Sequence, residues 1–236
     1  MNIEFSEKLN IKKDIQSFIA DYKSKLNELF TERNDENELL TDRGLPPYIL
    51  REVLEHNPLS TFIPSEFGGR GAKTSEALAM LSATSYQSLP LSLMMGINGA
   101  LFLQPIANYG SDEAKTTVFH EFLEKKKMGG LMITEPDFGS DALRMQTGFK
   151  HSDENDSYKI EGLKHWAGLT GWADFWLITA RGYDKSGELG RDIGFFIHDS
   201  SNGGIDVLEY YKNLGLYMLP YGKNKIDITV PDSYRL

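Results

Sequence analysis

GLMITEPDFGSD, at residues 130–141, marks the place where the sequence changes from a helical to a β pattern. Its apolar run ends at Thr134, breaks at Pro136 and turns through small and acidic residues to Asp141. A strand end followed by such a turn exposes backbone N–H groups and hydroxyls. These groups can hold an anion or the polar edge of a ring. From these residues alone, an ordinary connecting loop is the alternative.

On the N-terminal side, apolar residues recur at steps of three and four. This period predicts a helix over about residues 8–32, followed by a polar loop over 32–42. A second helix is expected to open at Pro46-Pro47, and a third covers roughly 75–88. Another runs from the cap at Ser111 to the lysines that end at Lys127, with acidic and basic ends that suit the helix dipole.

Residues 89–109, LPLSLMMGINGALFLQPIANY, are about as long as a membrane span. However, Asn98, Gln104 and Asn108 are polar, and Pro105 interrupts the hydrogen-bond ladder. A helix that is apolar all round is typical of the buried centre of a globular protein. We therefore predict a buried central helix and no membrane span.

On the C-terminal side, short runs rich in β-branched and aromatic residues alternate with Gly, Asp, Asn and Ser. The candidate strands are 130–134, 144–151, 157–166, 174–182, 192–198, 205–212 and 225–230. Their spacing predicts a compact antiparallel barrel or sandwich. The expected fold class is α+β with two domains: an all-α domain over 1–128 and an antiparallel β-barrel or sandwich domain over 129–236.

Composition excludes several classes of function. The chain has 236 residues, no cysteine, and 25 Lys+Arg against 34 Asp+Glu, spread without a basic half. Nucleic-acid binding is therefore not expected, and disulfide scaffolds, thiolate catalysis and Cys-ligated metals are excluded. The five histidines show no metal-binding spacing, so we predict no metal site. The lack of cysteine fits a reducing compartment, and we expect a cytoplasmic protein.

TEPDFGSD at 134–141 resembles the flavin-site signature T-E-P-x-A-G-S-D of the acyl-CoA dehydrogenase family. Three more segments are similar to motifs of that family, in order and at similar spacing: IPSEFGGRGAKTSEALAML at 63–81, PIANYGSDEAK at 105–115 and YKIEGLKHWAGLTGWADFWLITAR at 158–181. The four segments follow one another along the chain from residue 63 to residue 181. The resemblance implies the same helical-then-β layout and FAD as cofactor.

The resemblance implies FAD-binding roles for named residues. Thr134 matches a threonine that donates to the N1/C2=O edge of the isoalloxazine, and donors there favour the reduced flavin. Ser140 matches a serine that binds the FAD pyrophosphate. Trp166 matches a tryptophan that packs on the flavin ring. The alternative is that Trp166 is a core tryptophan, like Trp172 and Trp176.

Gly168 is a departure from the family pattern. It occupies the position of a serine or threonine whose hydroxyl bonds flavin N5, and glycine offers only its backbone N–H. Thr170 lies nearby and substitutes only if the loop rearranges. We still expect Gly168 to contact the cofactor.

The family's β domain leads into a third, helical domain that usually holds the catalytic glutamate and most of the oligomer contact. Here Val230-Pro231 is followed by five residues, which stop short of that domain. We therefore assign no catalytic residue within 1–236. The resemblance implies that the missing domain comes from a separate polypeptide or was lost by truncation.

The leading hypothesis is an FAD-dependent acyl-CoA dehydrogenase-like oxidoreductase, which desaturates an acyl-CoA thioester in fatty acid metabolism and is present as a two-domain fragment or split subunit. Without the third domain we expect it to be inactive. Implied partners are acyl-CoA, a separate C-terminal-domain polypeptide or homo-oligomer, and an electron-transfer flavoprotein or similar acceptor. Two alternatives remain. Gly168 motivates a flavin-dependent monooxygenase of the same fold, and the missing domain motivates a non-catalytic partner-binding subunit.

Overall fold

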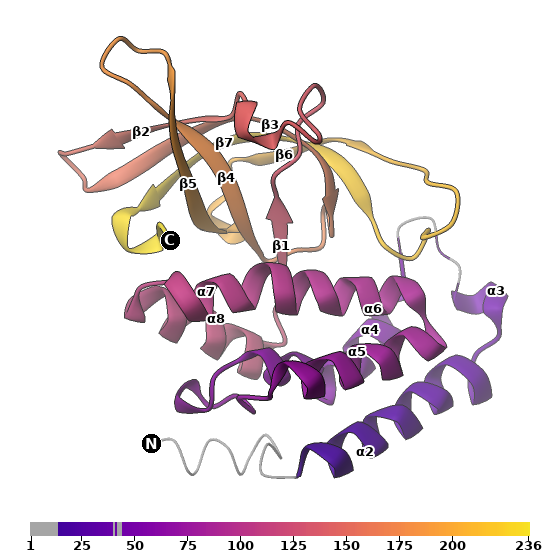
Figure 1. Cartoon of the computed structure of the whole chain (residues 1–236). Helices are drawn as coiled ribbons and strands as arrows, with labels where there is room; N and C mark the ends of the chain where they lie inside the picture. Colours follow the sequence, from indigo (N-terminus) through magenta and orange to yellow (C-terminus); the bar gives the residue numbers. More distant parts are fainter. Residues whose placement is uncertain (1–13, 40, 42–43) are drawn as a thin grey trace. The chain divides into compact units, whose positions relative to one another are not determined.

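The computed structural model describes residues 14–39, 41 and 44–236. Contacts divide them into two units. One unit runs to Ala107 and adds Thr116–Lys127 and Asn213–Leu219. The other contains Asn108–Lys115, Met128–Lys212 and Pro220–Leu236. In Figure 1 the colours pass from the indigo and magenta helices to the orange and yellow strands along the chain.

The helices of the first half lie close to their predicted positions. They are α2 (Ile15–Asn27), which continues as a π-helical turn (Glu28–Glu32), α4 (Pro47–Glu55), α5 (Thr74–Gln87) and α8 (Asp112–Lys125). The side chain of Asp14 caps α2 by accepting from the N–H of Gln16 at 3.2 Å. Burial of every third or fourth residue of α2, including Tyr22 and Leu26, confirms the predicted apolar stripe. The predicted start near residue 8 lies outside the described residues.

The predicted loop over 32–42 contains a short helix, α3 (Glu36–Leu39). The N–H of Glu38 donates to the carboxylate of Asp35 at 3.0 Å, and the N–H of Asp35 donates to the carboxylate of Glu38 at 3.2 Å. This reciprocal pair is a capping box, which satisfies two donors at the helix start. The loop prediction is therefore wrong for this one turn.

Residues Leu89–Tyr109 form the helical run predicted there, as α6 (Leu89–Gly96), a π-helical segment (Ile97–Leu103) and α7 (Gln104–Tyr109). Within the described part of the chain, this run is the one helix long and apolar enough to cross a membrane, and 44% of its most apolar window is buried. Its burial is one-sided. Phe102 and Ile106 are fully buried, whereas Leu89 is 56% and Leu101 44% exposed. The expectation of burial all round is thus only partly met.

All seven predicted strands are present, within a few residues of the expected ends. They are β1 (Gly129–Met132), β2 (Gly148–Ser152), β3 (Ser157–Gly168), β4 (Phe175–Tyr183), β5 (Leu189–Asp199), β6 (Ile205–Tyr210) and β7 (Tyr221–Pro231). They form one curled sheet in the order β1-β4-β2-β3-β7-β6, with β5 also paired to β4 (Figure 1). The α+β class is confirmed.

The sheet is mixed rather than antiparallel throughout. β4 pairs in parallel with β1 and with β2, while the β2/β3, β3/β7, β4/β5 and β6/β7 pairs are antiparallel. Parallel neighbours need long connections. The segment between β1 and β4, which includes the 133–147 turn and the β2–β3 hairpin, supplies one.

Candidate functional site

The turn after β1 has one buried and one exposed side. Glu135 and Phe138 close it by exchanging backbone hydrogen bonds of 3.3 and 3.2 Å. Glu135 is 3% exposed, whereas Asp137, Gly139 and Ser140 are exposed. Ser140 thus lies on the outer part of the turn, and Thr134 is half-buried at its start. An exposed turn of small residues leaves its N–H groups accessible to an anion.

A buried ion pair holds this turn on the sheet. The Lys164 ammonium lies 3.0 Å from Glu135 Oε1, and both side chains are buried. Lys164 also donates to the carbonyl of Ile133 at 3.0 Å and to the Thr179 hydroxyl at 3.3 Å. Glu135 accepts from the N–H and the hydroxyl of Thr147. The pair therefore joins β3 and β4 to both ends of the turn.

The pKa values of the pair follow from burial and mutual attraction. Burial lowers the pKa of Lys164 to about 8, against the opposing influence of Glu135. Burial alone would raise the pKa of Glu135, but the Lys164 charge and the hydrogen bonds from Thr147 lower it overall. Both groups are therefore charged at neutral pH. A carboxylate held in this way is a structural anchor and not a proton acceptor for a substrate.

The turn is also tied to β3 at the predicted aromatic residue. The N–H of His165 donates to the Thr134 carbonyl at 2.9 Å. At this point the β3/β7 register shifts between Lys164 and Ala167, which is a β-bulge. Trp166 lies in the bulge with a left-handed φ of 54°. This hydrogen bond thus joins Thr134 to His165, the residue next to Trp166 in β3.

Trp166 is 49% exposed, in contrast to Trp176, which is 3% exposed. The alternative that Trp166 is a core residue of this unit is therefore wrong. Its indole lies 4.8 Å from the Tyr211 ring, 5.3 Å from the His165 ring and 6.1 Å from the Tyr221 ring, measured between centroids. We call these four residues the aromatic cluster. It presents a supported, half-exposed aromatic surface of the kind on which a planar ring can stack.

Gly168 and Thr170 lie just beyond the bulge. Gly168 is buried in β3 opposite Tyr221. Thr170 is fully buried, and its hydroxyl donates to the Ala167 carbonyl at 2.8 Å and accepts from the Asn224 amide at 3.0 Å. This hydroxyl is engaged inside the protein. The departure at Gly168 is therefore not compensated by Thr170 in this arrangement.

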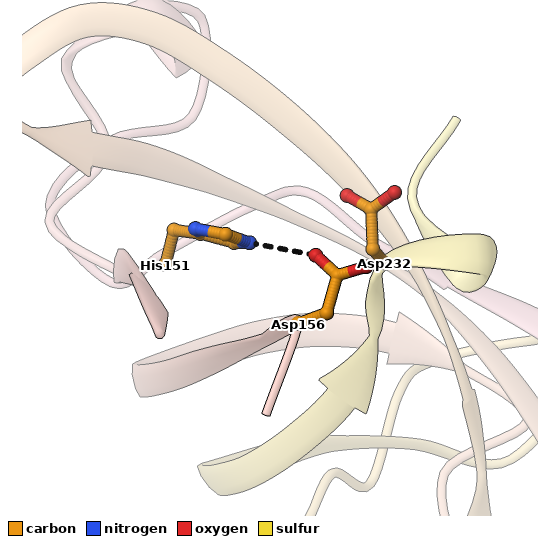
Figure 2. Close-up of side chains that lie close together, drawn as sticks. All are labelled: His151, Asp156 and Asp232. Carbon is orange, nitrogen blue, oxygen red and sulfur yellow. Dashed lines mark hydrogen bonds and ion pairs between the residues drawn. The ribbon is translucent and has the colours of Figure 1, made fainter. Parts of the chain in front are cut away.

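A second cluster lies on the same unit. His151, Asp156 and Asp232 place ligand-type atoms within 4.8 Å of one another, and all three are exposed (Figure 2). The ring nitrogens of His151 lie 2.9 Å from Asp153 and 3.2 Å from Asp156. Burial would lower the pKa of His151, but hydrogen bonds to Asp156 and Asp153 raise it overall. When the ring is protonated, each ring nitrogen forms an ion pair with one of these carboxylates, and we call this arrangement the ion-pair clasp.

Sequence reasoning missed His165, Tyr211 and the Lys164–Glu135 pair. Tyr211 reaches His165 across 46 residues of sequence, so no local spacing could have pointed to it. Lys164 lies in a segment that resembles a motif of the family, but a strand lysine ordinarily faces solvent. Its burial depends on the turn that carries its carboxylate partner.

The comparisons with known proteins agree with this layout. A family model described as acyl-CoA dehydrogenase, N-terminal domain, matches residues 11–126, and one described as the middle domain matches 130–227. Benzylmalonyl-CoA dehydrogenase of Aromatoleum aromaticum is 29% identical over 198 residues, which are 82% of this chain and 50% of that protein. Glutaryl-CoA dehydrogenase of Desulfococcus multivorans is 26% identical over 98% of this chain and 57% of its own length.

Solved structures share the fold. A glutaryl-CoA dehydrogenase from Mycobacterium smegmatis in complex with FADH2 has a TM-score of 0.79 at 19% identity, over 95% of this chain and 55% of that chain. The present chain thus spans about half the length of the relatives it matches. Two domain models of one family account for nearly all of its residues. The chain therefore belongs to the acyl-CoA dehydrogenase family, of which it carries the N-terminal and middle domains.

Proposed function

We propose that this chain is the flavin-holding part of an acyl-CoA dehydrogenase-like oxidoreductase that desaturates an acyl-CoA thioester between its α and β carbons. The observation that carries the proposal is the half-exposed indole of Trp166, which a strained bulge displays beside Thr134. Strained backbone of this kind is concentrated at functional sites. The relatives named above, including one whose structure holds FADH2, support the same reading.

The described residues fit FAD. The half-exposed aromatic surface suits a flat ring, and the turn that ends at Ser140 exposes N–H groups and a hydroxyl to an anion. In the proposed arrangement Thr134 binds the N1/C2=O edge, Ser140 binds the pyrophosphate, Trp166 covers the ring and excludes water, and Gly168 offers its N–H. Bound FAD supplies the hydride acceptor of the reaction. This chain's own residues orient the cofactor.

The proton acceptor is proposed to lie outside these 236 residues. Desaturation needs a base for the α-proton. Glu135 is the buried acidic residue of the signature turn, and its carboxylate is paired with Lys164. We propose that the remaining part of the fold, supplied by a further polypeptide or by continuation of this one, brings the base. An electron-transfer flavoprotein or similar acceptor, and a cytoplasmic location, complete the proposal.

The test is FAD binding by the purified chain, followed through the visible flavin band and flavin fluorescence. We expect weak binding and no turnover by the chain alone. Thr134→Val and Trp166→Ala should each weaken binding about tenfold or more, since about 1.4 kcal/mol corresponds to one decade. Thr229→Val, an exposed β7 position outside the site, is the matched control. Equal affinities for all four proteins, or strong dehydrogenase activity by the chain alone, would refute the proposal.

One observation favours a second chemistry on the same fold. Gly168 provides no hydroxyl for flavin N5, and the Thr170 hydroxyl is engaged with Ala167 and Asn224. A different flavin environment would suit a monooxygenase that uses reduced flavin and O2. Oxygen consumption that depends on an added flavin reductase would favour this alternative. If no flavin binds at all, a non-catalytic partner-binding subunit becomes the better explanation.

A further inference from the structure

The Trp166 backbone needs support from its surroundings. A left-handed φ of 54° is unfavourable for a bulky side chain. Such a conformation persists only where neighbouring groups over-determine it. The bulge places Trp166 outside the register pairs of the β3/β7 ladder. The side chains that contact the indole are a further source of support.

The rings of Tyr211 and His165 both contact the indole of Trp166. His165 Nδ1 lies 2.8 Å from the Tyr211 hydroxyl, and both rings contact the Trp166 ring. Tyr211 follows β6 directly, and its N–H donates to the Tyr221 carbonyl at 2.9 Å. His165 is fixed in the same way by its N–H bond to Thr134. A side-chain hydrogen bond thus joins two anchored residues that both contact the indole. We call this hydrogen-bonded pair, His165 and Tyr211, the bracket.

The charge state of His165 sets the direction of this hydrogen bond. Burial, and next the charge of Lys223, lower the pKa of His165, while Glu209 acts in the opposite sense. Lys223 and Glu209 lie opposite each other on β7 and β6. Burial raises the pKa of the Tyr211 hydroxyl, so it keeps its proton. At neutral pH the ring is therefore uncharged, and in the tautomer that carries its hydrogen on Nε2 the Tyr211 hydroxyl donates to Nδ1.

We propose that His165 and Tyr211 are positioning residues for Trp166. Their hydrogen bond holds the indole and the bulge in one orientation, so that the ring surface is preorganised for a planar ligand. The identity of that ligand as flavin rests on the proposed function; the bracket itself does not. Protonation of His165 puts a hydrogen on Nδ1 and reverses the donor direction. Above pH 6.5 the Tyr211 hydroxyl is the donor, and as the pH falls through the lowered pKa of the folded-state ring the ring becomes the donor and the bracket changes form.

The experiment follows Trp166 emission and anisotropy in the whole chain, taken as the difference from the Trp166→Phe variant, from neutral to acidic pH. Wild type should show a transition below pH 6.5, and His165→Gln should remove it. Tyr211→Phe keeps the ring and loses the donor that favours neutral histidine. Its midpoint should therefore rise by about half a pH unit, and its Trp166 anisotropy at neutral pH should fall. Tyr183→Phe, at the end of β4 and outside the aromatic cluster, should leave both unchanged.

An unchanged midpoint and anisotropy in Tyr211→Phe would overturn the proposal, and so would a wild-type transition that survives His165→Gln. A second arm adds FAD. Tyr211→Phe should weaken FAD binding about threefold or more and shift the visible flavin band, with Tyr183→Phe as control. If FAD binds to none of the proteins, the proposed function fails while the emission titration still decides the bracket. If FAD binds but the Tyr211→Phe titration is unchanged, only the bracket fails.

Discussion

Replacing Lys164 by methionine isolates the buried ion pair that anchors the turn after β1. The two charges are 3.0 Å apart, and at an effective dielectric constant of about 20 their attraction is about 5 kcal/mol. Desolvation offsets part of this attraction, but loss of one partner leaves the other charge buried. We therefore expect Lys164→Met to lower the free energy of unfolding by about 3–5 kcal/mol.

The β3 strand also provides a matched control. Lys159 pairs with Asp227 on the surface, where side chains are 43% and 52% exposed. Lys159→Met should cost less than about 1 kcal/mol, because solvent screens exposed pairs. Adding Glu135→Gln to Lys164→Met removes the stranded charge and keeps an acceptor for Thr147. The double variant should therefore recover about 1 kcal/mol or more of the loss.

Urea unfolding followed by tryptophan fluorescence measures these differences. All three tryptophans belong to the unit built on the sheet, so their emission reports that unit. The denaturant slope should stay constant if only stability changes. If Lys164→Met costs no more than Lys159→Met, or the double variant is as unstable as the single one, the ion pair does not anchor the turn.

Three further outcomes test other parts of the structure. Gly99→Ala should lower the free energy of unfolding by about 1–3 kcal/mol, because its Cβ would lie 2.3 Å from the Phe62 ring. Gly96→Ala meets nothing within 4 Å and should raise the free energy of unfolding by about 0.5–1 kcal/mol. Unfolding followed by circular dichroism measures both, and equal stabilities of the two variants would contradict this reasoning. The ion pairs of His151 stabilise the fold fully below pH 6.5, and this stabilisation is lost as the pH rises through the raised folded-state pKa. His151→Gln removes the ion pairs, so a difference in stability from wild type that persists at alkaline pH would contradict the clasp. Arg235→Met should lower the free energy of unfolding, measured in urea, by about 1 kcal/mol, because the guanidinium lies 5.1 Å from the ring centroids of Phe149 and Tyr158. A variant as stable as wild type would argue against this contact.

Most of the fold could be predicted because periodicity reports which face of an element is buried. The stripe on α2 and the alternation in β7 are examples, and both elements lie where the pattern predicts. Pairing partners are a different matter. The parallel contact of β1 with β4 depends on a long connection, and the residues of β1 carry no mark of it. The capping box at Asp35 and Glu38 was readable as D-x-x-E, but the acidic composition around it favoured a loop.

For the candidate site too, residues within local motifs could be predicted from the sequence, whereas contacts between distant residues could not. Thr134 and Trp166 could be identified by resemblance, because each lies within a local motif, and their assignment to FAD remains a prediction. The contacts that hold them join distant parts of the chain: Thr134 to His165, and His165 to Tyr211. Lys164 shows a further limit. Its burial follows from a partner 29 residues away, so a strand pattern that assigns charged side chains to solvent misplaces it.

The bulge in β3 constrains the number of residues in this strand more than it constrains their identity. The extra residue shifts the register, so that Lys164 faces Asn224 whereas Ala167 faces Gly222 on β7. Deletion of one residue there would turn Ala167 to the opposite face of the sheet. Substitutions at Trp166 preserve the register of β3 with β7, whereas an insertion or deletion between Lys164 and Ala167 does not. Relatives that diverge freely in composition at this strand should therefore still agree in residue count across it.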